Sequence, residues 1–96
     1  MSKKFNNKVV WITGASSGIG EATAYRFAQE GARIIVTALE ADLLEGVVNR
    51  CKELGAPDAA ALPFDLSDSD GLDALAEKAW NQFGGIDVLY NNAGIS

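Results

Sequence analysis

The chain has 96 residues, an apolar share of 48% and a formal net charge of −5. This length allows one domain, and the acidic balance argues against nucleic acid or an anionic membrane as a partner. We expect a cytoplasmic protein, because no apolar run approaches the roughly 20 residues that span a bilayer, the first residues lack a signal-peptide core, and the single cysteine, Cys51, cannot form an internal disulfide.

Apolar runs alternate with helical patterns along the first half of the chain. Residues 8–13 are predicted to form a buried strand because the run is almost continuously apolar. A helix is expected over residues 18–30, a second strand over 33–38 and a second helix over 40–54. The predicted buried faces are Ile19, Ala24, Phe27 and Ala28 in the first helix, and Leu43, Val47, Cys51 and Leu54 in the second.

The second half continues the alternation. Residues 59–64 predict a weak third strand, which is rich in alanine, contains Pro63 and therefore belongs at a sheet edge. Ser67 and Asp70 have capping-box spacing and predict the start of a third helix, which runs to about residue 83. A fourth strand is expected over residues 86–91. The predicted core or near-core residues in this helix are Leu72, Leu75, Ala76, Ala79, Trp80 and Phe83, and Trp11 is placed with them.

The order β-α-β-α-β-α-β predicts an α/β fold with a parallel sheet and right-handed crossovers. In the doubly wound strand order 3-2-1-4, the first two helices cover one face and the third covers the other. The order reverses between the first and fourth strands, and ligands bind at this switch point in such sheets.

A glycine-rich segment, Thr13–Gly20, follows the first strand and opens the first helix. Its spacing is Gly-x-x-x-Gly-x-Gly: Gly14 suits a tight turn, Gly18 a close backbone approach to phosphate, and Gly20 close helix–strand packing. A helix N-terminus of this kind binds anions, and the ligand class that fits is a dinucleotide with its pyrophosphate over the turn. The alternative is a strand–turn–helix corner that binds nothing.

This segment, together with Asp65 and the later Asn91-Asn92-Ala93-Gly94, resembles the short-chain dehydrogenase/reductase family. The resemblance implies a Rossmann-like fold, an NAD(P) cofactor and oxidoreduction of an alcohol/carbonyl pair. It covers the whole chain but only the N-terminal half of the family's domain. The family's catalytic Tyr-x-x-x-Lys is not present, since Gln29 and Gly94 stand four residues after the two tyrosines. We therefore expect residues 1–96 to form a truncated dinucleotide-binding half-domain that is inactive alone.

The resemblance also implies individual cofactor contacts. The N–H groups and hydroxyls of Ser16 and Ser17 would donate to the pyrophosphate or ribose, unless they serve only the turn. Asp65 would accept from the adenine amino group with help from the backbone of the next residue; alternatively it belongs to the helix start with Ser67. Asn92 would also brace neighbouring strands. The predicted cofactor-binding residues are Gly14, Ser16, Ser17, Gly18, Ile19, Gly20, Ala38, Leu39, Asp65, Leu66, Asn92, Ala93 and Gly94; no catalytic residue and no metal ligand is predicted.

The end of the second strand usually distinguishes NAD from NADP, through an acidic residue that binds the ribose diol or an arginine that binds the 2′-phosphate. Here the two positions hold Ala38 and Leu39, so the sequence fits neither pattern. Glu40 is close and would repel a 2′-phosphate, which leans the prediction toward NAD and leaves NADP open.

Two functional classes remain on the sequence: part of an oxidoreductase, or a non-catalytic nucleotide-binding module, either a natural remnant or an engineered one. Both predict the same fold and cofactor contacts. The chain is also expected to self-associate, through the unpaired edge of the fourth strand or the sheet face that only the third helix covers. Strand residues in the run 9–12 are expected to lie near water on that face.

Overall fold

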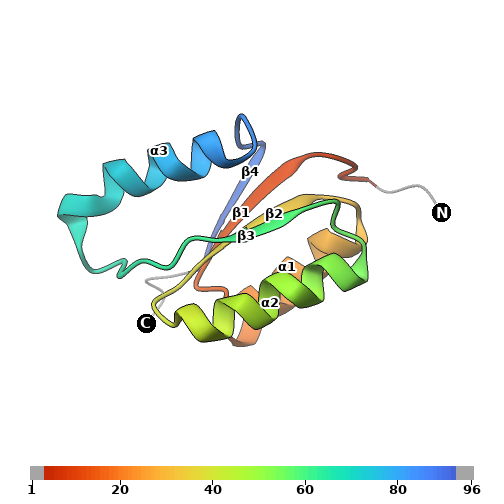
Figure 1. Ribbon diagram of the computed structural model, residues 1–96, viewed down its shortest axis with the longest axis horizontal. Helices are drawn as coiled ribbons and strands as arrows, with labels where there is room; N and C mark the ends of the chain where they lie inside the picture. Colours follow the sequence, from red (N-terminus) through yellow and green to blue (C-terminus); the bar gives the residue numbers. More distant parts are fainter. Residues whose placement is uncertain (1–3, 93–96) are drawn as a thin grey trace.

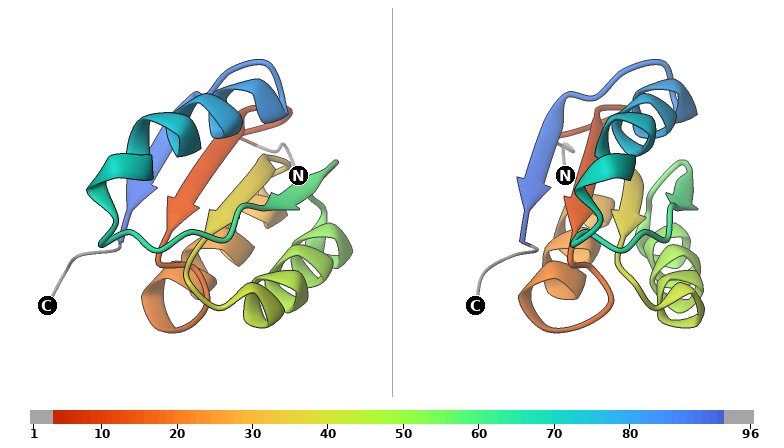
Figure 2. Two further views of the ribbon diagram at one scale, coloured as in Figure 1. Left: turned by 60° about the vertical axis from the view of Figure 1, so that its left-hand side comes forward. Right: turned by 90° about the vertical axis from the view of Figure 1, so that its left-hand side faces the viewer.

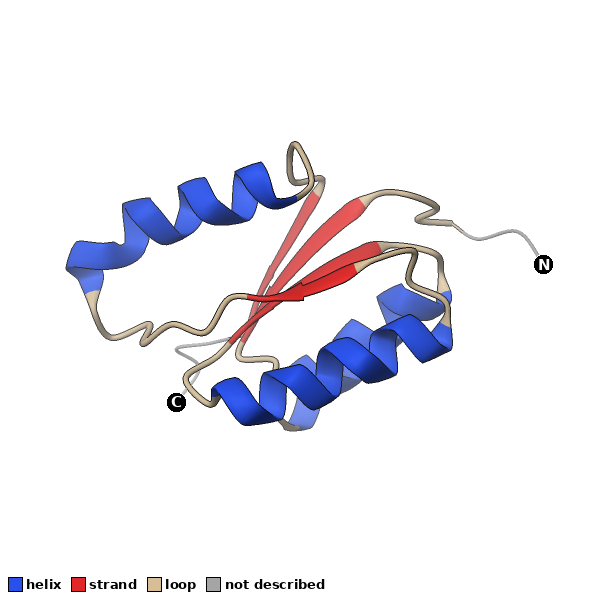
Figure 3. Cartoon of the chain, in the orientation of Figure 1, coloured by secondary structure: helices blue, strands red, loops and turns tan. Residues whose placement is uncertain are grey.

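The computed structural model describes residues 4–92, which form a four-stranded parallel sheet with helices on both faces (Figure 1). The strand order is β3-β2-β1-β4, which confirms the predicted α/β, Rossmann-like topology. The elements in chain order are β1 (Val9–Thr13), α1 (Gly18–Gln29), β2 (Arg33–Thr37), α2 (Ala41–Leu54), β3 (Ala59–Ala61), the short 3-10 helix η1 (Ser69–Gly71), α3 (Leu72–Gln82) and β4 (Val88–Asn91) (Figure 3).

Helices α1 and α2 lie on one face of the sheet, and α3 lies on the other (Figure 2). Alternate strand residues point to opposite faces, so each strand contributes to two cores. Facing α1 and α2 are fully buried side chains such as Val10 and Ile34, which are partners in the β1–β2 register. Small residues of α1, Ala24 and Ala28, are also fully buried and let this helix approach the sheet closely.

The core beneath α3 is smaller. Trp11 and Ile35, which pair across β1 and β2, pack there with Leu75 and Ala79 of α3. The indole N–H of Trp11 donates to the hydroxyl oxygen of Thr37 at 2.8 Å, and this bond is buried. It satisfies a polar group that would otherwise be costly inside an apolar layer.

The buried stripe of α2 differs from the predicted one by one position. Leu43 is exposed, whereas Leu44 is fully buried with Val47, Val48 and Cys51. These four residues follow i, i+3, i+4, i+7, which is the pattern of a helix lying flat on a sheet. In α1, Ile19 is likewise exposed, whereas the next residue, Gly20, is buried.

The third helix corrects three expectations. Asp68, rather than Ser67, caps η1, and its carboxylate accepts from the N–H of Asp70 at 3.2 Å, so the predicted capping box is wrong. Leu75 and Ala79 face the sheet, and this orientation leaves the next residue around the helix, Trp80, 56% exposed. Leu72 and Ala76, also predicted for this core, are exposed.

The position of β3 at a sheet edge agrees with the prediction, whereas the predicted exposure of β1 on the face beneath α3 is wrong. β3 lies at one edge, as expected, but spans only three residues. All five residues of β1 are buried, so the expectation that residues 9–12 lie near water is wrong. Apolar exposure is instead found on β4, at Leu89 and Tyr90. None of the helices among residues 4–92 combines the length and apolarity needed to cross a bilayer.

Candidate functional site

The glycine-rich turn joins the carboxyl end of β1 to the N-terminus of α1, beside β4. It therefore lies at the switch point of the sheet, where the order of strands reverses. Gly14 has φ of 66° and Gly18 has φ of 60°, a left-handed conformation that glycine adopts without strain. A Cβ at Gly18 would meet no atom within 4 Å, so the space above this backbone is open for a ligand.

Gly20 has a different role, because there is no room for a side chain. A Cβ built there would collide with the carbonyl oxygen of Gly14 and would lie 3.0 Å from the side-chain nitrogen of Asn92. The first turn of α1 is therefore pressed against the end of β1. This contact fixes the direction in which the helix N-terminus points.

Hydrogen bonds from β4 brace the same turn. The hydroxyl of Thr13 donates to Asn91 Oδ1 at 2.7 Å and accepts from the backbone N–H of Asn92 at 3.1 Å. The Asn92 side chain donates to the carbonyl of Gly14 at 3.3 Å. Thr13 and Asn91 were not among the predicted site residues. Their signal in the sequence is that polar residues end two strands whose carboxyl ends meet at one edge.

The N-terminus of α1 is arranged to accept an anion. Its first backbone bond runs from Glu21 N–H to the carbonyl of Ser17 at 3.4 Å, so the N–H groups of residues 18–20 precede the first closed turn. Ser17, the N-cap residue, makes no side-chain bond to them. These donors and the positive end of the helix dipole fit a pyrophosphate.

The carboxylate of Glu21, in the first turn of α1, is hydrogen-bonded to a side chain of the next turn. The hydroxyl of Tyr25 donates to Glu21 Oε2 at 2.6 Å, one helical turn further on. Burial and this hydrogen bond raise the pKa of Tyr25 to about 12, so its hydroxyl keeps the donating proton. The bond directs the negative charge of Glu21 toward the second turn of α1.

The end of β2 closes the other side of the site. Ala38 is buried, and its carbonyl accepts from the N–H of Phe64 at 3.0 Å, which ties β2 to the segment after β3. Leu39 is exposed. The hydroxyl of Ser16 donates to Glu40 Oε1 at 2.9 Å and links the turn to the residue before α2.

Asp65 lies on the exposed segment that follows β3. Its Oδ1 accepts from the hydroxyl of Ser67 at 2.6 Å and from the Ser67 N–H at 3.0 Å, and these bonds lower the pKa of the Asp65 carboxyl. This is the local role that the sequence offered as the alternative to adenine binding. Contact with adenine stays a prediction for Oδ2. The Leu66 side chain is partly buried against the core beneath α3. Ala93 and Gly94 lie outside the described residues.

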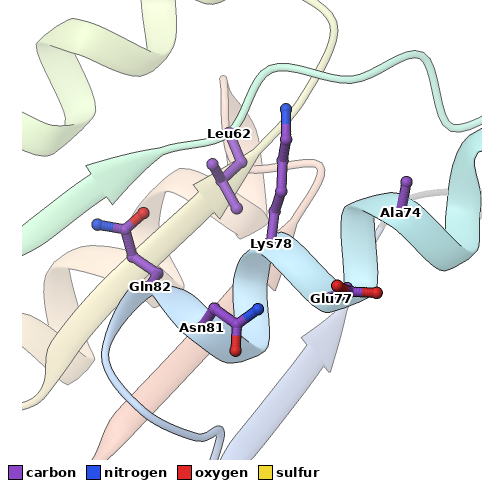
Figure 4. Close-up of a pocket in the computed structure, with 6 residues that line it drawn as sticks. All are labelled: Leu62, Ala74, Glu77, Lys78, Asn81 and Gln82. Atoms are coloured by element: carbon purple, nitrogen blue, oxygen red, sulfur yellow. The ribbon is translucent and has the colours of Figure 1, made fainter.

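A separate groove of about 730 Å³ lies between α3 and the end of β3, away from the turn (Figure 4). Long polar side chains of α3 form one wall, and Leu62 reaches toward them from the opposite side. The lining residues are Leu62, Ala74, Glu77, Lys78, Asn81 and Gln82. None of them belongs to the predicted site.

Two further chemistries find no support among residues 4–92. No group of three or more His, Cys, Asp or Glu side chains is placed to hold a metal ion. Cys51 is fully buried on the sheet-facing side of α2, and burial raises the pKa of its thiol to about 12, so it stays protonated and unreactive.

Comparison with known proteins assigns the chain to a family. The family model for short chain dehydrogenase matches residues 8–96. The chain belongs to the short-chain dehydrogenase/reductase family. The 11-beta-hydroxysteroid dehydrogenase-like 4A of Arabidopsis thaliana is 44% identical to it over 99% of this chain and 32% of its own length. The human dehydrogenase/reductase SDR family member 7 is 41% identical over 97% of this chain and 28% of its own length.

Solved structures of family members share the fold. L-sorbose reductase from Gluconobacter frateurii, complexed with NADPH and L-sorbose, superposes with a TM-score of 0.87 at 40% identity. It is matched over 98% of this chain and 36% of its own. An NAD⁺-bound xylitol dehydrogenase gives 0.89 at 37% identity, over 96% of this chain and 35% of its own. This chain thus spans about a third of the length of the family members it matches.

The close contact at Gly20 predicts opposite effects of one substitution at two glycines. Gly20→Ala should destabilise the fold by about 1–3 kcal/mol, because the new Cβ forces α1 away from Gly14. Gly46→Ala in α2 is the control: its Cβ meets nothing within 4 Å, and alanine should stabilise this helix by about 0.5–1 kcal/mol. Urea unfolding of both variants measures the difference. Equal stabilities would contradict the assigned packing.

Proposed function

We propose that this chain is the cofactor-binding portion of an oxidoreductase that interconverts an alcohol and a carbonyl compound, with NAD as its dinucleotide. The observation that carries the proposal is the glycine turn, which presents uncapped N–H groups over open space at the switch point. Family members of known structure contain NADPH or NAD⁺ in complexes of the same fold. The nicotinamide ring supplies or accepts a hydride when a dinucleotide is bound.

The residues of this chain bind and orient rather than transfer a proton. In the family pattern the proton is handled by Tyr-x-x-x-Lys, and no such pair stands within the 96 residues. We therefore propose that the 96-residue chain binds the cofactor without turning over an alcohol or ketone. We also propose a reducing, cytoplasmic setting, because its single cysteine is buried and free.

The charges around the site favour NAD over NADP. The loops that follow β1, β2 and β3, taken with the first turns of the helices after them, contain no lysine or arginine. Their charges are all acidic, at Glu21, Glu40, Asp42, Asp65, Asp68, Asp70 and Asp73. Two unit charges of like sign about 4 Å apart repel by about 1 kcal/mol in bulk water and about 4 kcal/mol near a protein surface. A 2′-phosphate would meet this repulsion, whereas a free ribose diol would find hydrogen-bond acceptors.

The phosphate-binding role of the turn predicts that substitutions at Gly18 block binding. Gly18→Val should lower the affinity for NAD at least about tenfold, ~1.4 kcal/mol, by filling the open space above the turn. Gly18→Asn is the second variant, because asparagine tolerates positive φ and fills the same space with less strain. Calorimetry gives the affinities and thermal unfolding verifies the fold. An NAD affinity equal to that of the parent, in folded variants, would refute the assignment.

The charge distribution predicts a salt-dependent preference between dinucleotides. At low ionic strength, NAD should bind at least about tenfold more tightly than NADP, ~1.4 kcal/mol. The gap should narrow as salt screens the exposed carboxylates. Titration of both dinucleotides at 20 mM and at roughly 500 mM salt, chosen to span Debye lengths of about 20 to 4 Å, tests this. Tighter binding of NADP at low salt would overturn the preference for NAD.

We further propose that isolated copies of the chain associate through β4. This strand has no neighbour on its outer side among the described elements, and its sequence Val-Leu-Tyr-Asn carries no charge (Figure 2). Leu89 pairs with Trp11 and so lies on the α3 face, while Tyr90 pairs with Ile12 and lies on the opposite face. A second copy could therefore extend the sheet and cover exposed apolar groups on both faces.

Sedimentation at tens of micromolar, a range set by ordinary weak-interface affinities, measures this association. The parent should form dimers or larger species, and Leu89→Lys should return it to a monomer, because a charge on an edge strand opposes pairing. Leu43→Lys is the matched control: Leu43 is 52% exposed on α2, and Leu89 is 55% exposed. A monomeric parent would refute the proposal, as would equal effects of the two substitutions.

A further inference from the structure

The hydrogen bond between Ser16 and Glu40 joins two residues that are 24 positions apart in the sequence, one in the glycine turn and one just before α2. Glu40 is the N-cap residue of α2, yet its side chain makes no capping bond to that helix. Its carboxylate instead reaches across to the glycine turn and accepts from Ser16 Oγ at 2.9 Å. The side chain of Glu40 therefore binds the glycine turn and does not cap its own helix.

The backbone beneath this bond fixes both of its ends. The N–H of Ala15 donates to the carbonyl of Thr37 at 3.3 Å, which ties the turn to the end of β2. The carbonyl of Glu40 accepts from Leu44 N–H at 3.1 Å in the first turn of α2. One of these backbone hydrogen bonds involves Ala15, next to Ser16, and the other involves Glu40 itself. The fold consequently sets the separation of the Ser16 and Glu40 backbones, and the hydrogen bond between their side chains places the carboxylate.

The bond determines which hydrogen-bonding groups remain for a ligand. A serine hydroxyl has one proton, and Ser16 donates it to Glu40. What these two side chains retain for a ligand is Oε2 of Glu40 and the lone pairs of Ser16 Oγ, all of them acceptors. Acceptors suit ribose hydroxyls, which can donate. They oppose a 2′-phosphate, which brings further acceptors and negative charge.

We propose that Ser16 is a positioning residue that sets the preference for a dinucleotide with a free 2′-hydroxyl by holding the Glu40 carboxylate against the glycine turn. This inference rests on the proposed NAD-binding function. Without the Ser16 hydroxyl, the exposed Glu40 side chain would sample other rotamers in water and spend less time beside the ribose. Ser16 then acts on selectivity through Glu40, whereas a residue that simply held the turn would alter the binding of both dinucleotides alike.

The test measures the ratio of the NADP and NAD dissociation constants for the 96-residue chain and its variants. Ser16→Ala should lower this ratio about threefold to tenfold, toward the value of Glu40→Gln. Ser16→Thr, which keeps the hydroxyl, should restore the parental ratio. Ser17→Ala is the matched control in the same turn; it should weaken both dinucleotides by the same factor and leave the ratio as in the parent.

A double-mutant cycle separates positioning from direct contact. In the Glu40→Gln background, Ser16→Ala should change the ratio by less than about twofold, because the group that Ser16 positions has lost its charge. Equal losses of NAD and NADP affinity in Ser16→Ala would overturn the role of Ser16 alone. A parent chain that binds neither dinucleotide would refute the proposed function, and this inference with it.

Discussion

The geometry of the site depends on the close approach of α1 to the end of β1. Because a Cβ at position 20 would overlap the carbonyl oxygen of Gly14, the helix can begin directly above the strand only with glycine at this point. The same carbonyl accepts from the side chain of Asn92, so the tight corner is also the point at which β4 is tied to β1. Thr13, the residue before Gly14, joins β1 to the end of β4 through a single hydroxyl. The direction of the helix N-terminus follows from this one contact.

The parallel topology also creates a conflict of charge at the carboxyl edge. Each helix that follows a strand has its N-terminus there, and acidic residues stabilise helix N-termini through the dipole, as Asp42 and Asp73 do in the first turns of α2 and α3. Basic residues correspondingly occupy the last turns, such as Arg26 and Lys52. An anionic ligand at this edge would therefore meet repulsion. In α1 the conflict is reduced, because Tyr25 holds the carboxylate of Glu21 one turn along the helix.

The strand order and the place of the glycine turn could be predicted because they depend on coarse constraints: alternation of elements, crossover handedness and glycine spacing. The rotation of each helix about its axis could not. Leu43 and Leu44 are equally apolar neighbours about 100° apart on the helix, and only packing against the sheet decides which is buried. Trp80 beside Ala79 poses the same ambiguity. The bond between Ser16 and Glu40 depends on the separation of β1 and β2 and leaves no local pattern in the sequence.

The two edges of β4 differ in hydrogen bonding: the inner edge pairs with β1, and the outer edge has no partner among the described elements. Its inner side pairs with β1, and its last residues, Asn91 and Asn92, hold the glycine turn through bonds that lie wholly within residues 4–92. Its outer edge is unpaired among the described elements, and Leu89 and Tyr90 are exposed on its two faces. Trp80 of α3 is also exposed. The bonds that hold the glycine turn and the unpaired edge of the sheet thus lie on opposite sides of β4. Covering the outer side would bury apolar surface without moving the atoms that shape the turn, so association at this edge and dinucleotide binding at the switch point can vary independently.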